Sequence, residues 1–121
     1  MEDNRGTGKI FSLETRTFEF AKEVALFCRK LPKTGSNIEY LKQVIRSSGS
    51  VGANYIEANE ALSKKDFAMR MKISRKEAKE SGYWLRLIIE TNDEKFKGEG
   101  IDLYRESMEL KKIFSSIIKK C

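Results

Sequence analysis

One periodic pattern constrains the fold of this chain more than any other feature. Between residues 64 and 91, apolar and small side chains recur at alternating steps of four and three residues. The members of this seam are Phe67, Met71, Ser74, Ala78, Ser81, Leu85 and Ile88. Such spacing places them on one face of an α-helix that packs against other helices as in a coiled coil. The sequence therefore predicts a long helix from about Lys64 to Thr91.

Three further helices are predicted. A second seam of the same type (Leu103, Ser107, Leu110, Phe114, Ile117 and Cys121) favours a helix from about Asp102 to Lys119. A helix from about Leu13 to Leu31 carries two apolar stripes, so we expect burial on more than one side. These stripes are Phe18, Ala21, Ala25 and Cys28, then Phe20, Val24, Phe27 and Leu31. Another helix, up to about Ala61, follows Pro32 and Gly35.

The predicted junctions carry capping and turn signals. Ser36 with Glu39 has the spacing of a capping box, and Ser63 with Asp66 has the spacing of a second cap. The stretch "NDEKFKGEG", residues 92–100, is expected to be a polar turn. No strand pattern is present, so we predict an all-α, antiparallel up-down four-helix bundle over residues 12–121, after a flexible segment at 1–11.

Composition argues against several classes of function. The chain has 121 residues, 35% of them charged, and it contains no histidine and two widely separated cysteines. Zinc-binding spacing is absent, no apolar run approaches the roughly 20 residues of a membrane span, and the N-terminus lacks the apolar core of a signal peptide. We therefore expect a cytoplasmic protein that is not an enzyme, with no catalytic residue, metal or cofactor and no membrane partner.

The stretch "IRSSGSVGANYIEANEA", residues 45–61, could be a phosphate-binding loop, a linker or a helix. Gly49 and Gly52 have no preceding strand and no suitably placed lysine, as a phosphate loop requires. Apolar residues keep helical spacing through the stretch, as no linker needs to. We therefore predict a helix whose small residues permit a close contact, within the bundle or between subunits. The contact residues are Ser48, Gly49, Gly52, Ala53 and Asn54.

Glu77 is the one acidic residue that we place at the edge of the apolar face of the third helix. A carboxylate in that position must be paired, hydrogen-bonded or protonated. Arg46, Asn54 and Arg70 are candidate partners. We interpret Glu77 as part of a polar contact between helices rather than as a catalytic acid, because no second acid or histidine completes a site.

A stripe of basic residues lies on another face of the third helix, in a chain of net charge +6. Its members are Lys72, Arg75, Lys76, Lys79, Tyr83 and Arg86. A basic stripe with an aromatic residue is typical of surfaces that bind a phosphate backbone. The alternative is a solvated face on which Glu80 and Glu90 pair with the cations locally. We interpret the lysines of the fourth helix, interspersed with Glu106 and Glu109, as a solvated face.

The chain resembles the four-helix-bundle family first noticed as reading frames inside intervening sequences of bacterial large-subunit ribosomal RNA. The resemblance covers about residues 16–91. It rests on a pattern similar to "S-[IV]-x-A-N-x-x-E-[AG]", which here reads "SVGANYIEA" from Ser50 to Ala58. Phe67 near the start of the next helix, and Glu77 and Glu80 before "YWL", also fit. Many members have Gly where Ala58 stands, which does not affect the expected fold.

The resemblance implies a bacterial cytoplasmic bundle, often a ring-shaped homopentamer, with no established catalytic activity. In distant relatives, which are accessory proteins of retroelement reverse transcriptases, a basic pentamer binds nucleic acid and the polymerase. The residues add a reason to expect a homo-oligomer: Phe20, Phe27, Met69, Trp84 and Leu87 give apolar faces beyond one bundle seam. We therefore expect partners among RNA, DNA or a nucleic-acid-processing protein. The alternative is a protein-binding scaffold without nucleic-acid contact.

Overall fold

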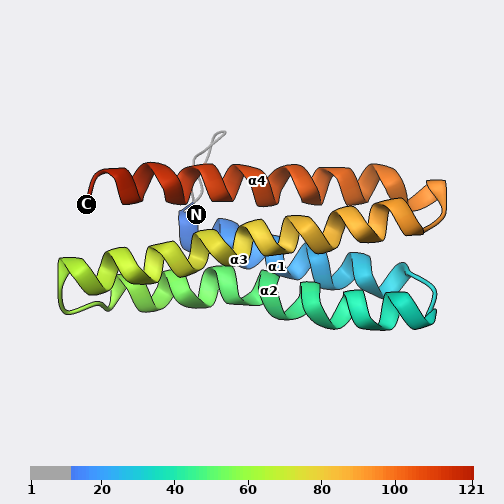
Figure 1. Ribbon diagram of the computed structural model, residues 1–121, viewed down its shortest axis with the longest axis horizontal. Coiled ribbons are helices and arrows are strands. Elements are labelled where there is room, and N and C mark those ends of the chain that lie inside the picture. The colour runs from blue at the N-terminus through green and yellow to red at the C-terminus, as the bar shows by residue number, and fades with distance from the viewer. Residues whose placement is uncertain (1–11) are drawn as a thin grey trace.

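The computed structural model describes residues 12–121, which form four helices and no strand. The helices are α1 (Leu13–Lys30), α2 (Gly35–Asn59), α3 (Lys64–Thr91) and α4 (Lys97–Lys119), with a 3-10 turn, η1 (Glu94–Phe96), before α4. Successive helices run side by side in opposite directions (Figure 1). This architecture is consistent with the predicted antiparallel four-helix bundle. The expected flexible segment at 1–11 lies outside the described residues.

The predicted seams form the core. On α3, six of the seam positions are buried and Phe67 is half-buried. On α4, Leu103, Ser107, Leu110 and Phe114 are buried, Ile117 is half-buried and Cys121 is exposed. Burial of apolar surface along these seams is the main force that holds the four helices together. The four-three spacing therefore predicted both the helices and the sides on which they pack.

The two apolar stripes of α1 differ in how far they are buried. Phe20 and Phe27 are 2% and 0% exposed, and both belong to the core of a single chain. The expectation that these two phenylalanines extend beyond one bundle seam was wrong. Phe18, by contrast, is 64% exposed and lines a groove beside α2, whereas Cys28 at the other end of the same stripe is 3% exposed. Only the second stripe of α1 is directed into the bundle along its whole length.

The start of α2 differs from the predicted capping box at Ser36. The N-cap residue is Thr34, whose Oγ1 accepts a hydrogen bond from the backbone N–H of Asn37 at 3.1 Å. Asn37 is buried, and its side-chain amide donates to the carbonyl of Pro32 and to Asn92 Oδ1. The local cap at Thr34 and the tertiary bond between Asn37 and Asn92 thus accompany a helix that begins earlier than the predicted capping box. The cap predicted at Ser63 is confirmed, since Ser63 Oγ accepts from the backbone N–H of Asp66.

The start of α4 is the largest departure from the sequence prediction. The helix begins at Lys97 rather than near Asp102, and it includes Gly98 and Gly100. Gly100 is buried where an added Cβ would lie 2.7 Å from Ile89 Cγ1 and 3.4 Å from the ring of Phe27. Close packing of three helices around this glycine offsets its cost in a helix of about 1 kcal/mol.

Candidate nucleic-acid interface

The predicted basic stripe lies along an outer face of α3. Lys72, Lys76, Lys79, Tyr83 and Arg86 are exposed and Arg75 is half-buried. The opposite side of the same helix carries the buried seam. The stripe extends over roughly 20 Å, given a rise of about 1.5 Å per helical residue. It is therefore a continuous line of positive charge on the surface of the chain.

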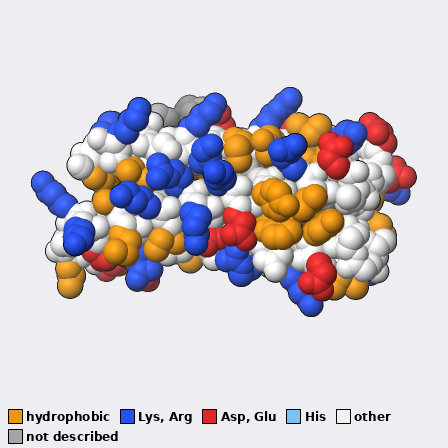
Figure 2. All heavy atoms as spheres, viewed as in Figure 1, with side chains coloured by type: hydrophobic (Ala, Val, Ile, Leu, Met, Phe, Trp, Pro, Cys, Tyr) orange, Lys and Arg blue, Asp and Glu red, His pale blue; other side chains and the backbone are white. Residues whose placement is uncertain are grey.

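Helix α4 contributes to the same surface. A shallow cavity of about 380 Å³ lies between the two helices and is lined by Lys72, Arg75, Lys76, Lys79, Lys111 and Ser115. The guanidinium of Arg75 donates a long hydrogen bond of 3.5 Å to Ser115 Oγ. Figure 2 shows Lys and Arg side chains gathered over one half of this side of the molecule, next to hydrophobic side chains. We call the six cavity residues, with Tyr83 and Arg86, the basic surface.

Lys111 and Ser115 were missed by the sequence analysis. The mixed charges of α4 suggested an ordinary solvated face. The spacing within α4 indicates which residues share a side of that helix, but it does not indicate which residues of α3 they meet. The register of α4 against α3 places Lys111 beside four cations of the neighbouring helix. No local signal in the sequence carries that register.

Glu80, one of the two carboxylates expected to neutralise the stripe, pairs with another helix. Glu80 Oε2 pairs with Arg46 of α2 and accepts a 3.1 Å hydrogen bond from Trp84 Nε1. Burial alone would raise the pKa of Glu80. The hydrogen bonds from Trp84 and Arg46, with the attraction of Arg46 and Lys76, outweigh burial and lower this pKa. Glu80 is therefore a carboxylate held in its charged form and directed towards α2.

Glu77 has the same partner. It is 7% exposed, and its Oε1 accepts a 3.2 Å hydrogen bond from Arg46 Nη1. Of the three partners considered from the sequence, Arg46 makes the contact. Arg70 instead donates to Asn54 Oδ1 at 3.3 Å. Arg46 thus binds two carboxylates from successive turns of α3 and joins α2 to α3.

The basic surface consequently keeps its charge. Within residues 12–121, no carboxylate lies within ion-pair distance of Lys72, Arg75, Lys76, Lys79, Arg86 or Lys111. Glu90 also forms no ion pair among these described residues. Clustered like charges without counter-ions raise the local positive potential and attract polyanions. The local pairing expected of a merely solvated face is not what this part of the chain contains.

The predicted contact residues of α2 divide into two groups. Gly52 faces α1, where an added Cβ would lie 2.8 Å from Thr17 Oγ1. Ser48 is buried, whereas Gly49 has no atom of another element within 4 Å of an added Cβ. Ala53 is exposed, and Asn54 donates to the carbonyl of Ser50 in its own helix. Within one chain, the closest approach therefore involves Gly52 rather than the whole set.

Gly49 and Ala53, together with Gly52, line an apolar groove of about 470 Å³ between α1 and α2. Its other lining residues include Phe18, 64% exposed, and Ile56, 45% exposed. Glu14 lies at the same groove. An apolar groove of this kind on the surface of a chain is typical of a protein contact rather than of a phosphate site.

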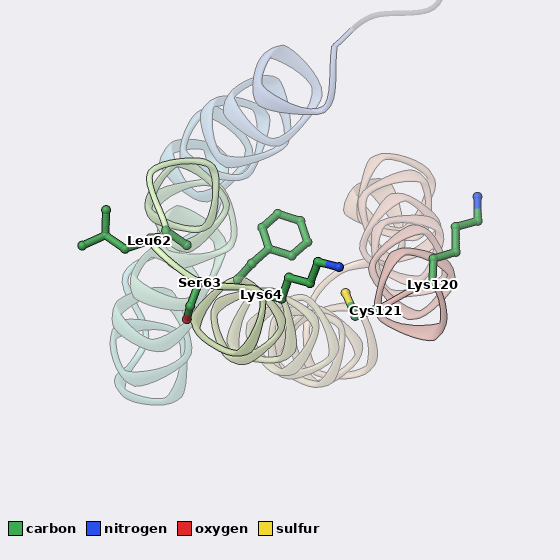
Figure 3. A pocket seen from close by; sticks show the side chains of 7 residues that line it. Leu62, Ser63, Lys64, Lys120 and Cys121 are labelled. Carbon is green, nitrogen blue, oxygen red and sulfur yellow. The ribbon is translucent and has the colours of Figure 1, made fainter.

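A further cavity of about 470 Å³ lies between the α2–α3 turn and the far end of α4. Figure 3 shows Lys64 directed towards the cavity beside Cys121, while Leu62 and Lys120 are directed away. None of its lining side chains carries a carboxylate or imidazole. In residues 12–121, no cluster of three His, Cys, Asp or Glu residues has the geometry to hold a metal ion. This cavity therefore offers no side-chain carboxylate that could pair with the cations of the basic surface.

Comparison with known proteins agrees with the architecture. Residues 12–116 match the family model of the 23S rRNA-intervening sequence protein. The chain belongs to this family. The match spans all four helices, so the family resemblance predicted from "SVGANYIEA" and the third helix is confirmed. A search of curated proteins found no match.

A solved relative of the intervening-sequence family has the same fold. It is a crystal structure of a protein with unknown function from the S23 ribosomal protein family of Bacteroides thetaiotaomicron VPI-5482. The two chains are 33% identical, and the match covers 89% of this chain and 99% of the other, with a TM-score of 0.79. Family membership therefore fixes the fold, while the relative's function is unknown.

None of the helices in residues 12–121 is long and apolar enough to cross a membrane. Each helix instead carries charged residues along its exposed side.

Proposed function

We propose that this protein is a non-enzymatic, cytoplasmic homo-oligomer that presents its basic surface to nucleic acid or to a nucleoprotein partner. The observation that carries the proposal is the set of six cations from α3 and α4 without an ion-pair partner among residues 12–121. Phosphate groups are the natural counter-ions for such a set, because a protein that neutralises them releases condensed cations from the nucleic acid.

Self-association would raise the affinity for nucleic acid of a basic surface that binds weakly on its own. One basic surface supplies a few phosphate contacts, whereas a ring of subunits carries one basic surface per subunit, and these surfaces act together on one strand. The apolar groove between α1 and α2 supports self-association, because Phe18 and Ile56 expose apolar area there. The five-membered ring implied by the family resemblance is our preferred arrangement.

Charge reversal on α3 tests the nucleic-acid proposal. The triple variant Lys72→Glu, Lys76→Glu and Lys79→Glu should abolish retention on heparin and on immobilised RNA or DNA. Helicity and sedimentation should not change, since all three side chains are exposed. For the wild type, log affinity should fall with log salt, by ~0.9 per phosphate contact for duplex or ~0.7 for a single strand.

A matched control separates the surface from net charge. Lys22→Glu, Lys33→Glu and Lys42→Glu change the charge by the same amount at exposed positions away from the basic surface. This control should keep its binding. If both triple variants lose binding alike, then net charge rather than the basic surface is responsible. If the wild type fails to bind nucleic acid at about 50 mM salt, where such association is strong, the proposal is wrong.

The second candidate function is a protein-binding scaffold, and the apolar groove is the observation that favours it. A contact through Phe18 and Ile56 would respond little to salt, because burial of apolar area rather than phosphate neutralisation would stabilise it. Purification from native cells, with nuclease added to half of the sample, distinguishes the two. A partner that is retained after nuclease treatment and in high salt supports the scaffold.

A further inference from the structure

Tyr83 is the aromatic residue of the basic surface, and the residue is 58% exposed. It lies one helical turn after Lys79 and one turn before Arg86, so cations stand on both sides of it along α3. Solvent exposure of this much of an aromatic residue leaves a face available for a ligand. A hydrophobic side chain in the middle of a phosphate-binding stripe contributes nothing to the neutralisation of phosphate.

The ring of Tyr83 contacts the ring of the neighbouring Trp84. It packs edge-on against Trp84, with ring centroids 5.2 Å apart and an interplanar angle of 76°. Trp84 is in turn held by its hydrogen bond to Glu80 and by the ring of Tyr40 at 6.1 Å. A ring that is positioned before binding loses little conformational entropy when it stacks on a ligand.

We infer that the basic surface binds single-stranded rather than double-stranded nucleic acid, with one unpaired base stacked on Tyr83. This inference rests on the function proposed above and names its substrate class. Cationic surfaces with exposed aromatic rings bind single strands because the cations follow the backbone and the rings stack on bases. In a duplex the base faces are covered by neighbouring bases, so a duplex could use the cations but not Tyr83.

The inference is tested with fluorescence anisotropy on labelled strands of about 12 nucleotides, a length within the range of known single-strand sites. Single-stranded RNA, single-stranded DNA and the matching duplexes are compared with the wild type, Tyr83→Leu and Tyr83→Phe. At least one of the single strands should bind more tightly than its duplex. Tyr83→Leu should weaken single-strand binding about 5- to 150-fold, as expected for loss of one stacked base, and should leave duplex binding unchanged. Tyr83→Phe should retain affinity because the ring remains.

Salt dependence separates stacking from charge. Tyr83→Leu removes no cation, so the slope of log affinity against log salt should stay that of the wild type. Lys79→Gln is the matched control from the preceding turn, and it should reduce this slope by ~0.7 on a single strand. Trp84 is the sole tryptophan of the chain, so its fluorescence should change on binding of a single strand.

The outcomes distinguish this inference from the function on which it rests. Equal binding of single strand and duplex, or a Tyr83→Leu variant that loses both alike, would overturn the stacking role while leaving the basic surface as a nucleic-acid site. Absence of binding to every strand and duplex would overturn both proposals. Circular dichroism of Tyr83→Leu checks that an altered affinity does not arise from unfolding.

Discussion

The two sides of α3 differ in whether their charged side chains are paired. Glu77 and Lys76 are adjacent in the chain, yet Glu77 is buried against Arg46 whereas Lys76 is exposed with no ion pair among the described residues. Glu80 and Lys79 show a similar division one turn later, where the half-buried Glu80 pairs with Arg46 and Lys79 is exposed. Because the two glutamates are engaged by α2, the lysines beside them form no direct ion pair within residues 12–121, and Lys76 attracts Glu80 only at longer range. The polar contact that joins the helices thereby also produces the basic surface.

The inner side of α3 is closely packed with small polar residues. Ser81 Oγ lies 2.8 Å from Ser47 Oγ of α2 and donates to the carbonyl of Glu77. Ser74 Oγ donates to the carbonyl of Val51 at 3.0 Å. Small side chains bring the two helices close, and each buried hydroxyl has a partner, so none carries the cost of an unsatisfied polar group. We therefore expect the inner side to determine stability and the outer side to determine binding.

The largest expected effect comes from a large residue on the inner side. Ser81→Leu would force extra volume into a contact where Ser81 is 0% exposed, and it would remove the partner of Ser47. Overpacking of this kind costs about 1–3 kcal/mol of unfolding free energy, measured by urea denaturation. Lys79→Leu, the same change to leucine on the exposed side, should stay within about 0.5 kcal/mol of the wild type. Similar losses of unfolding free energy in Ser81→Leu and Lys79→Leu would contradict the view that the inner side of α3 determines stability and the outer side determines binding.

A smaller change in stability is expected on α2, where a glycine packed against α1 and a glycine that faces outward should respond differently to substitution by alanine. Gly52→Ala places a Cβ 2.8 Å from Thr17 Oγ1, and Thr17 is buried and hydrogen-bonded to the carbonyl of Glu14. Neighbouring atoms must shift to make room, so Gly52→Ala should lower the free energy of unfolding by about 1 kcal/mol. Gly49→Ala meets nothing within 4 Å and should instead stabilise the helix by about 0.5–1 kcal/mol. Opposite signs in thermal unfolding support the comparison, and a gain at both positions would show that α1 can yield.

The smallest expected effect concerns pH. The pKa of Glu80 is lowered in the folded protein, so its charged form contributes stability above the pKa of the unfolded state, about 4.3. That contribution is lost as pH falls through the folded-state pKa. Glu80 is partly exposed, so the contribution is expected to be below about 1 kcal/mol. Glu80→Gln should therefore flatten the decline of stability between about pH 5 and pH 3. An unchanged pH profile would mean that Arg46 and Trp84 do not favour the charged form.

Local patterns predicted most of the architecture. The seams of α3 and α4 and the helical state of residues 45–59 follow from spacing that repeats every turn, and the Ser63 cap follows from a local motif. The helix predicted through residue 61 was too long, since α2 ends at Asn59. The start of α4 could not be predicted, because Gly98 and Gly100 oppose a helix by propensity and only the approach of Ile89 and Phe27 explains the second glycine. Thr34 was not predicted as the cap although its bond to the backbone of Asn37 is local; the tertiary bond between the buried Asn37 and Asn92 is what the sequence could not show.

The basic surface was predicted only in part. Its six positions on α3 lie on the same side of one helix, which helical periodicity reveals. The choice of Arg46 as the partner of Glu77 and Glu80 was not evident, because an ion pair between helices depends on the register of α2 against α3. Lys111 and Ser115 were missed because they join the surface only through the register of α4.

The sequence by itself determined four helices, the buried sides of α3 and α4 and a line of positive charge along α3, because each is a property of one helix and repeats with its period. Only the tertiary structure decided which charges are neutralised. Coulomb attraction and hydrogen bonding fall off steeply with distance, and the distances between side chains of different helices are set by how closely those helices pack. Small residues on α2 and α3 allow that close approach, Arg46 consequently binds the glutamates, and the cations of the basic surface are left for a partner.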